Sequence, residues 1–137
     1  MSANREWRRN WRANWLGSIQ EFADDKGQRR LWLDSTNTNP HLSFVECICC
    51  YFDGLALSDG GYEWARIQGL VSDSEMAAVR PFHHITRAYR SPAGDYNHQA
   101  ILDDPKWAEI VAAAKQAQTA LLNLLGDPDE RRGLVGS

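Results

Sequence analysis

The stretch that decides the fold is residues 5–23, REWRRNWRANWLGSIQEFA. Its large apolar side chains recur every three or four residues, at Trp7, Trp11, Trp15, Ile19 and Phe22. That spacing matches the α-helical repeat, so the five side chains share one face. Gly27 follows at a position suited to ending a helix. We therefore predict an amphipathic first helix over residues 5–23.

The rest of the chain also favours helices. Asn39-Pro40 combines an N-cap residue with a proline suited to the first helical position, and residues 42–57 are apolar almost all round. A helix of that composition is normally central and buried, although residues 44–52 are also compatible with a buried strand. Asp104-Pro105 is a second strong helix start, and periodic apolar residues follow it as far as Gly126.

Alternation of apolar and polar residues is short everywhere, so little or no sheet is expected. The sequence predicts an all-α protein, a compact helical bundle of about five helices. We expect a single domain over residues 1–126, made of the basic-aromatic helix 5–23 and a core over residues 39–126. Residues 127–137 are charged and rich in glycine, and we expect them to form a mobile tail.

Composition and charge narrow the class of protein. The chain has 137 residues, of which 43% are hydrophobic and six are Trp, so it can build a core. Residues 1–30 carry seven Lys and Arg against four acids, a net charge of +3, and residues 31–137 carry eight against fourteen, a net charge of −6. This asymmetry indicates either a charged partner or a basic head that packs on the acidic body of the same or a second chain.

The sequence also predicts a cellular compartment. The charged N-terminus lacks the apolar core of a signal peptide, and no apolar run reaches the length of a membrane span. Cys47, Cys49 and Cys50 lie within four positions and are odd in number, which argues against a disulfide framework. We expect a cytoplasmic protein without membrane contact.

The first helix is the leading candidate for a binding surface, through Trp7, Arg8, Trp11, Arg12 and Trp15. Tryptophan and arginine are enriched among the residues that dominate protein interfaces. The leading hypothesis is a small interaction module that binds a protein partner or itself, as a homodimer. In the alternative, the tryptophans dock on the core and arginine stems cover their edges. Nucleic-acid binding by this basic helix is a further alternative, less favoured because the whole molecule is acidic.

An enzyme is the other class of function considered. Glu46 and Asp53 are seven residues apart and share one helix face, and His83 with Arg87 forms a cationic face. These four are the catalytic candidates, and Glu46, Asp53, His83 and His98 are the metal candidates. Alternatively, Asp53 faces water at a helix end and the histidines lie at the surface. Because the chain lacks a phosphate loop, GxSxG and HExxH, we expect no cofactor and favour binding over catalysis.

Overall fold

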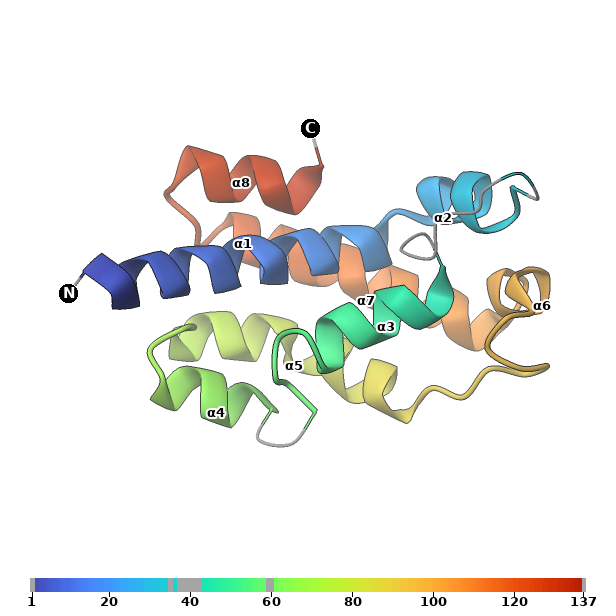
Figure 1. The fold of residues 1–137 in the computed structure, drawn as a ribbon, viewed down its shortest axis with the longest axis horizontal. Helices are drawn as coiled ribbons and strands as arrows, with labels where there is room; N and C mark the ends of the chain where they lie inside the picture. Colours follow the sequence, from blue (N-terminus) through green and yellow to red (C-terminus); the bar gives the residue numbers. More distant parts are fainter. Residues whose placement is uncertain (1, 35, 37–42, 59–60, 137) are drawn as a thin grey trace.

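The computed structural model describes residues 2–34, 36, 43–58 and 61–136 (Figure 1). Over these residues the chain forms eight α-helices, and none of the described residues lies in a strand. The helices are α1 (Ser2–Ala23), α2 (Asp25–Trp32), α3 (Phe44–Phe52), α4 (Gly61–Ile67), α5 (Asp73–Ala88), α6 (His98–Leu102), α7 (Pro105–Leu122) and α8 (Pro128–Val135). The all-α prediction is confirmed, whereas the expected number of about five helices is too low.

The extra helices are short and begin at local caps. Asp24 caps α2 by accepting a hydrogen bond from the N–H of Gly27 (3.0 Å). Gly27 was expected to end the first helix but lies inside α2. A β-carbon at Gly27 would come within 2.2 Å of the Asp24 carboxylate, so a larger residue there would have to displace the capping side chain. The chain therefore breaks after Ala23 and restarts at once, because Asp24 offers a new N-cap.

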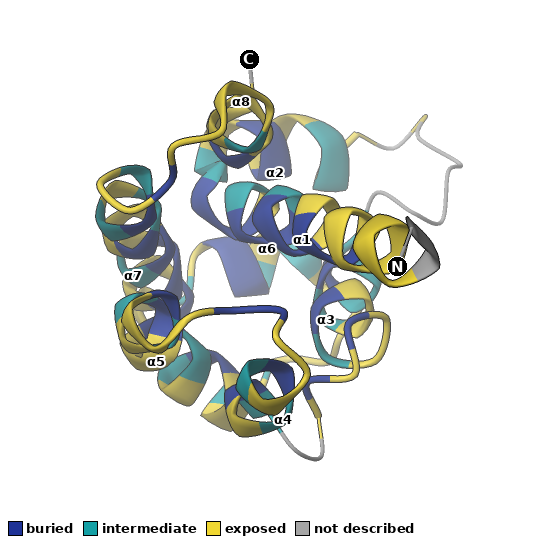
Figure 2. Ribbon diagram, turned by 90° about the vertical axis from the view of Figure 1, so that its left-hand side faces the viewer, coloured by how far each residue is buried: buried dark blue, intermediate teal, exposed yellow. Residues whose placement is uncertain are grey.

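The first helix α1 takes the central place in the fold. In the view along α1, helices α8, α7, α5, α4 and α3 are arranged around it (Figure 2). Trp15, Leu16, Ile19 and Phe22 are fully buried there. Helix α7 packs against both α1 and α5, and it contributes Ile110, Ala114 and Leu121 to the same core. The core therefore lies between α1, α5 and α7, which are the three longest helices.

Helix α3 differs from the prediction of a central, fully buried helix. It is a helix and not a strand, and it starts where Ser43 accepts a hydrogen bond from the N–H of Glu46 (3.2 Å). It buries Phe44, Cys47 and Tyr51 on one face, whereas the next two cysteines are exposed. The physical reason is position, because α3 covers one flank of α1 and meets solvent on its other face. The predicted start at Asn39-Pro40 lies outside the described residues.

The C-terminal segment 127–137 was expected to be a tail, but most of it forms α8. Asp127 is the N-cap, Pro128 takes the first helical position, and Gly136 ends the helix in the left-handed conformation (φ 77°). Leu134 is fully buried against the rest of the chain, and Gln118 donates a hydrogen bond to its carbonyl (2.8 Å). The two caps define the ends of α8, and the buried side chain of Leu134 helps to pack this largely charged segment against α1.

No helix in the described part of the chain is both long enough and apolar enough to cross a lipid bilayer.

Candidate interaction surface

The three tryptophans at the start of α1 lie at three different depths. Trp15 is fully buried, and its indole N–H donates to the hydroxyl of Tyr62 (2.8 Å). Trp11 is 6% exposed, stacks on Trp15 with ring centroids 5.7 Å apart, and donates to the Leu55 carbonyl (3.0 Å). Trp7 is 46% exposed. The inner two tryptophans therefore dock within the chain, and only Trp7 presents a large apolar surface to solvent.

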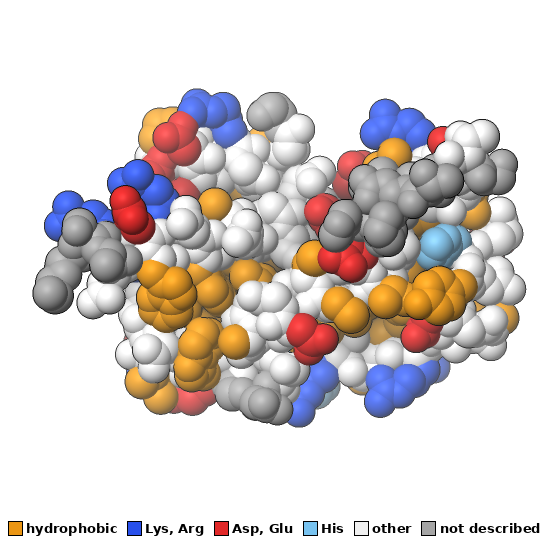
Figure 3. Space-filling model, in the orientation of Figure 1, with side chains coloured by type: hydrophobic (Ala, Val, Ile, Leu, Met, Phe, Trp, Pro, Cys, Tyr) orange, Lys and Arg blue, Asp and Glu red, His pale blue; other side chains and the backbone are white. Residues whose placement is uncertain are grey.

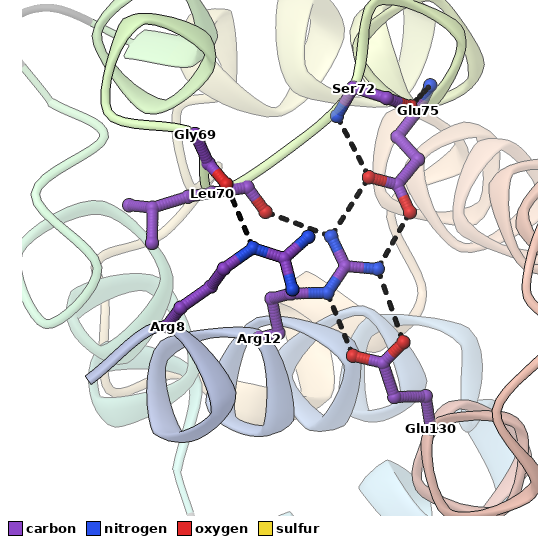
Figure 4. A network of polar contacts seen from close by, with 7 residues as sticks. All are labelled: Arg8, Arg12, Gly69, Leu70, Ser72, Glu75 and Glu130. Atoms are coloured by element: carbon purple, nitrogen blue, oxygen red, sulfur yellow. Dashed lines mark hydrogen bonds and ion pairs between the residues drawn. The ribbon is translucent and has the colours of Figure 1, made fainter. Parts of the chain in front are cut away.

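Arg12 is buried between three segments of the chain. Both of its terminal nitrogens donate hydrogen bonds to the carboxylate of Glu75 (2.8 and 2.7 Å). Two further hydrogen bonds go to the carboxylate of Glu130 (2.7 and 3.2 Å). Its fifth hydrogen bond goes to the carbonyl of Leu70 (2.8 Å) (Figure 4). A guanidinium has five N–H donors, so every donor of this buried group has a partner. The charge also lies 5.5 Å from the ring centroid of Trp15.

The two carboxylates decide the electrostatics of this cluster. Burial by itself would lower the pKa of Arg12, but the hydrogen bonds that it donates to Glu75 and Glu130 outweigh this effect and hold that pKa above its ordinary value. Burial would raise the pKa of Glu75, but its bonds with Arg12 and with the backbone N–H of Ser72 keep it lowered. Arg12 thus joins α1 to α5 and α8, and its guanidinium is not available to a partner of the folded chain.

The exposed part of α1 adjoins the end of α4. Arg8 donates from Nε to the carbonyl of Gly69 (2.9 Å), which fixes the outer turns of α1 against the turn after α4. A hollow of about 510 Å³ lies here, lined by Asn4, Arg5, Trp7, Arg8 and Gln68. Ile67, which precedes Gln68, is 67% exposed. We call these six residues the N-terminal surface. Figure 3 shows hydrophobic side chains over the N-terminal half of α1 and α4, with Lys and Arg side chains beside them at the start of α1.

The structure places the predicted partner-binding residues unequally. Trp7 and Arg8 belong to the N-terminal surface, whereas Trp11, Arg12 and Trp15 are buried. The predicted five-residue surface therefore narrows to two of its members, and the structure adds Ile67 and Gln68 from α4 and the turn after it. No periodicity in the sequence indicates that α4 ends beside Trp7, because the two segments are 60 residues apart and only the tertiary fold joins them.

The four catalytic candidates occupy different environments. Asp53 is the exposed C-cap of α3. Glu46 lies in the first turn of α3, and its Oε1 accepts a hydrogen bond from the Cys50 thiol (3.3 Å). Burial, together with this carboxylate, raises the pKa of that thiol to about 11, so it stays protonated at neutral pH. His83 turns inward to Tyr51, and Arg87 lines a separate groove between α3 and α5.

The metal candidates do not assemble into a site. In the parts of the chain that the structure describes, no group of three or more His, Cys, Asp or Glu side chains is arranged to hold a metal ion. His98 uses both ring nitrogens in hydrogen bonds, Nδ1 with the Trp32 carbonyl (3.0 Å) and Nε2 with the N–H of Phe44 (3.4 Å). It therefore connects α6 to α2 and α3.

A buried chain of hydrogen bonds, absent from the sequence-based expectations, crosses the core from α1 to α5. The Trp15 indole can only donate, so Tyr62 accepts from it, and the hydroxyls of Tyr62 and Tyr51 share a second hydrogen bond (2.6 Å). The Tyr51 hydroxyl forms a third hydrogen bond with Nδ1 of His83 (2.9 Å). Burial first, and then the nearby charges of Arg87 and His84, lower the pKa of His83 to about 4. The hydrogen bonds are thus continuous from Trp15 to His83, and burial favours the neutral form of His83.

Comparison with known proteins adds no family to this description. A scan against protein-family models, a search of curated proteins and a search of solved structures each found no match.

Proposed function

We propose that this chain is a small protein-interaction module that binds through its N-terminal surface. The observation that carries the proposal is the exposure of Trp7, 46% of whose side chain faces solvent at the end of an otherwise buried tryptophan stripe. Isolated exposed apolar residues are ordinary, but here Ile67 lies exposed next to Gln68, which lines the same hollow as Trp7. Tryptophan and arginine are the residue types most often found at interface hot spots.

The N-terminal surface is held in place before any partner arrives. Trp11 and Trp15 anchor the helix that carries Trp7, and Arg8 is bonded to the turn after α4. A preformed surface loses little conformational entropy when it binds, so more of its contact energy becomes affinity. This supports binding at the outer end of α1.

The proposed partner is an acidic protein surface, and we propose that a second copy of the chain provides it. Arg5 and Arg9 are exposed and form no ion pair with any residue that the structure describes. Residues 31–137 carry a net charge of −6, so the basic head of one copy is complementary to the acidic body of another. Two copies that exchange such contacts form a symmetric dimer in which each head meets the partner's body.

The same arginines bear on the nucleic-acid alternative. Of the four arginines on the flank of α1, Arg12 is consumed by two carboxylates and Arg8 is bonded to the backbone. Only Arg5 and Arg9 of these four are exposed and without a hydrogen bond or ion pair to any described residue, which is a small number for an affinity that depends on neutralised phosphates. The protein-interaction proposal needs only a mixed apolar and basic surface, which the structure contains.

The test is self-association measured by sedimentation velocity over a range of protein concentrations and salt concentrations. We expect a monomer–dimer equilibrium that Trp7→Ala weakens about tenfold or more, the effect of truncating a hot spot. Tyr96→Ala is the matched control, because Tyr96 is an aromatic residue 79% exposed and outside the N-terminal surface. A wild-type chain that stays monomeric at every concentration, or equal effects of the two substitutions, would contradict the proposal.

A further inference from the structure

A groove of about 420 Å³ lies between α3 and the C-terminal end of α5. We call it the α3–α5 groove. Its apolar wall is formed by Phe44, Ile48, Phe52 and Tyr89, and its polar rim by Arg87, Arg90, Ser58, Ser91 and Asp95. This volume falls in the range of small-molecule sites, which are mostly apolar with a few polar groups. The groove does not include any residue of the N-terminal surface.

The aromatic wall is held in one orientation by contacts behind it. The Tyr89 hydroxyl donates to Asp104 (2.9 Å), and its ring meets Phe44 edge to face, with centroids 5.9 Å apart. Thr86, which also lines the groove, directs its hydroxyl to the Phe82 carbonyl (2.6 Å) and so offers a ligand no free donor there. A flat apolar group can therefore pack on a wall of fixed shape without leaving the hydroxyl groups of Thr86 and Tyr89 unpaired.

The rim carries an excess of positive charge. Arg87 is exposed and makes no hydrogen bond or ion pair with any described residue, although it lowers the pKa of the neighbouring His83. Arg90 is held at the backbone, where it donates to the Tyr89 carbonyl (3.0 Å). Among the lining residues that the structure describes, Asp95 is the one acid, and it accepts a hydrogen bond from Ser91 (2.6 Å). Two guanidinium groups against one carboxylate give this described lining an excess of one positive charge.

From this combination we infer that the α3–α5 groove binds a small monoanionic carboxylate with an aromatic body. Guanidinium groups bind carboxylates through two parallel hydrogen bonds, and Arg87 has its donors free for one. The net charge of the rim matches a single negative charge, whereas a phosphate dianion would meet added repulsion from Asp95. The rings of Phe44, Phe52 and Tyr89 provide the surface for the aromatic body of the ligand.

The experiment is a calorimetric titration of the folded chain with phenylbutyrate, and with its neutral amide, phenyl phosphate and acetate as comparison probes. Each comparison probe removes or changes one part of the proposed recognition. We expect saturable binding of phenylbutyrate, and at least about tenfold weaker binding of the amide, of phenyl phosphate and of acetate, a difference of about 1.4 kcal/mol or more.

Two substitutions on the same helix distinguish the site from a general charge effect. Arg87→Gln is expected to weaken phenylbutyrate binding about tenfold or more. Arg80→Gln, two turns earlier on α5, exposed and outside the groove lining, is expected to leave it unchanged. Thermal melting of both variants checks that each is folded. The inference is overturned if phenylbutyrate shows no saturable binding, if any comparison probe binds equally well, or if the two variants behave alike.

Discussion

Helices α1 and α3 are buried in the reverse order of their apolar composition. α1 contains four arginines and several polar residues, yet it runs through the centre of the fold and supplies four fully buried side chains. α3, with the sequence FVECICCYF, has no basic residue, yet Cys49 and Cys50 are exposed on its outer face. Apolar composition alone would therefore predict, wrongly, that α3 is more deeply buried than α1.

The difference teaches that the partners of an element decide its burial. α1 is 22 residues long and contacts α7, α8, α3 and α2 along its length, whereas α3 has nine residues and covers one side of α1. A long helix can bury an arginine when carboxylates meet it, as Glu75 and Glu130 meet Arg12. A short helix at the edge exposes one face even when that face is apolar.

Removing the buried cation of α1 is the largest expected perturbation. Arg12→Leu should lower the free energy of unfolding by about 3–5 kcal/mol, because it leaves the buried carboxylate of Glu75 without its partner. Urea unfolding followed by circular dichroism measures the loss. In the double variant Arg12→Leu/Glu75→Leu the unpaired charge is gone, so it should be more stable than Arg12→Leu alone. A double variant that is less stable than the single one would mean that Glu75 stabilises the fold through its other contacts, such as the hydrogen bond from the Ser72 N–H.

Lowering the pH tests the hydrogen-bonded chain that connects the two helices. His83 has a pKa of about 4 in the folded protein and an ordinary value of about 6.5 when unfolded, so between these values the unfolded chain binds more protons. The contribution of His83 is complete above about pH 6.5 and is lost as the pH falls towards 4. We expect a loss of about 2 kcal/mol, since solvent screens part of the effect at a half-buried ring.

The control for this pH dependence is His83→Gln, whose amide can still hydrogen-bond to Tyr51 but does not titrate. Its free energy of unfolding, measured by urea titration at several pH values, should change less than that of the wild type between pH 6.5 and 4. Parallel curves for the two proteins would show that groups other than His83 cause the loss.

A substitution of Tyr51 tests how much the buried face of α3 contributes to the stability of the fold. Tyr51→Phe keeps the ring in the core but removes the hydroxyl that joins Tyr62 to His83. We expect a loss of about 1–2 kcal/mol, because Tyr62 and His83 each lose a hydrogen bond inside the core. Thermal unfolding measures it, and the pH dependence assigned to His83 should become weaker in the same variant. A stability equal to the wild type would mean that water replaces the hydroxyl.

The smallest effect is expected on the outer face of α3. Cys50→Ser should change the free energy of unfolding by less than about 0.5 kcal/mol, since the side chain is exposed. Cys47→Ser, three residues earlier and buried, is the matched comparison and should be clearly more destabilising. Equal losses for the two variants, measured by urea unfolding, would mean that both faces of α3 are covered in solution.

Local signals made much of the fold predictable. The tryptophan spacing of residues 5–23 predicted α1, and Asp104-Pro105 predicted the start of α7. The same kind of signal is present at Asp127-Pro128 and Gly136, which mark the two ends of α8, although the segment was expected to be a tail. Of the candidate site, the sequence indicated Trp7 and Arg8, but not which members of the stripe remain exposed.

Short-range patterns in the sequence account for the all-α class and for the long helices α1 and α7, because helical spacing and caps depend on residues a few positions apart. The tertiary fold brings carboxylates 63 and 118 positions away onto Arg12 and places Trp7 beside the end of α4. Periodicity says which side chains share a face, but the depth of each depends on neighbours that are distant in sequence. Of the three tryptophans near the start of α1, Trp11 and Trp15 therefore belong to the core and Trp7 to the surface.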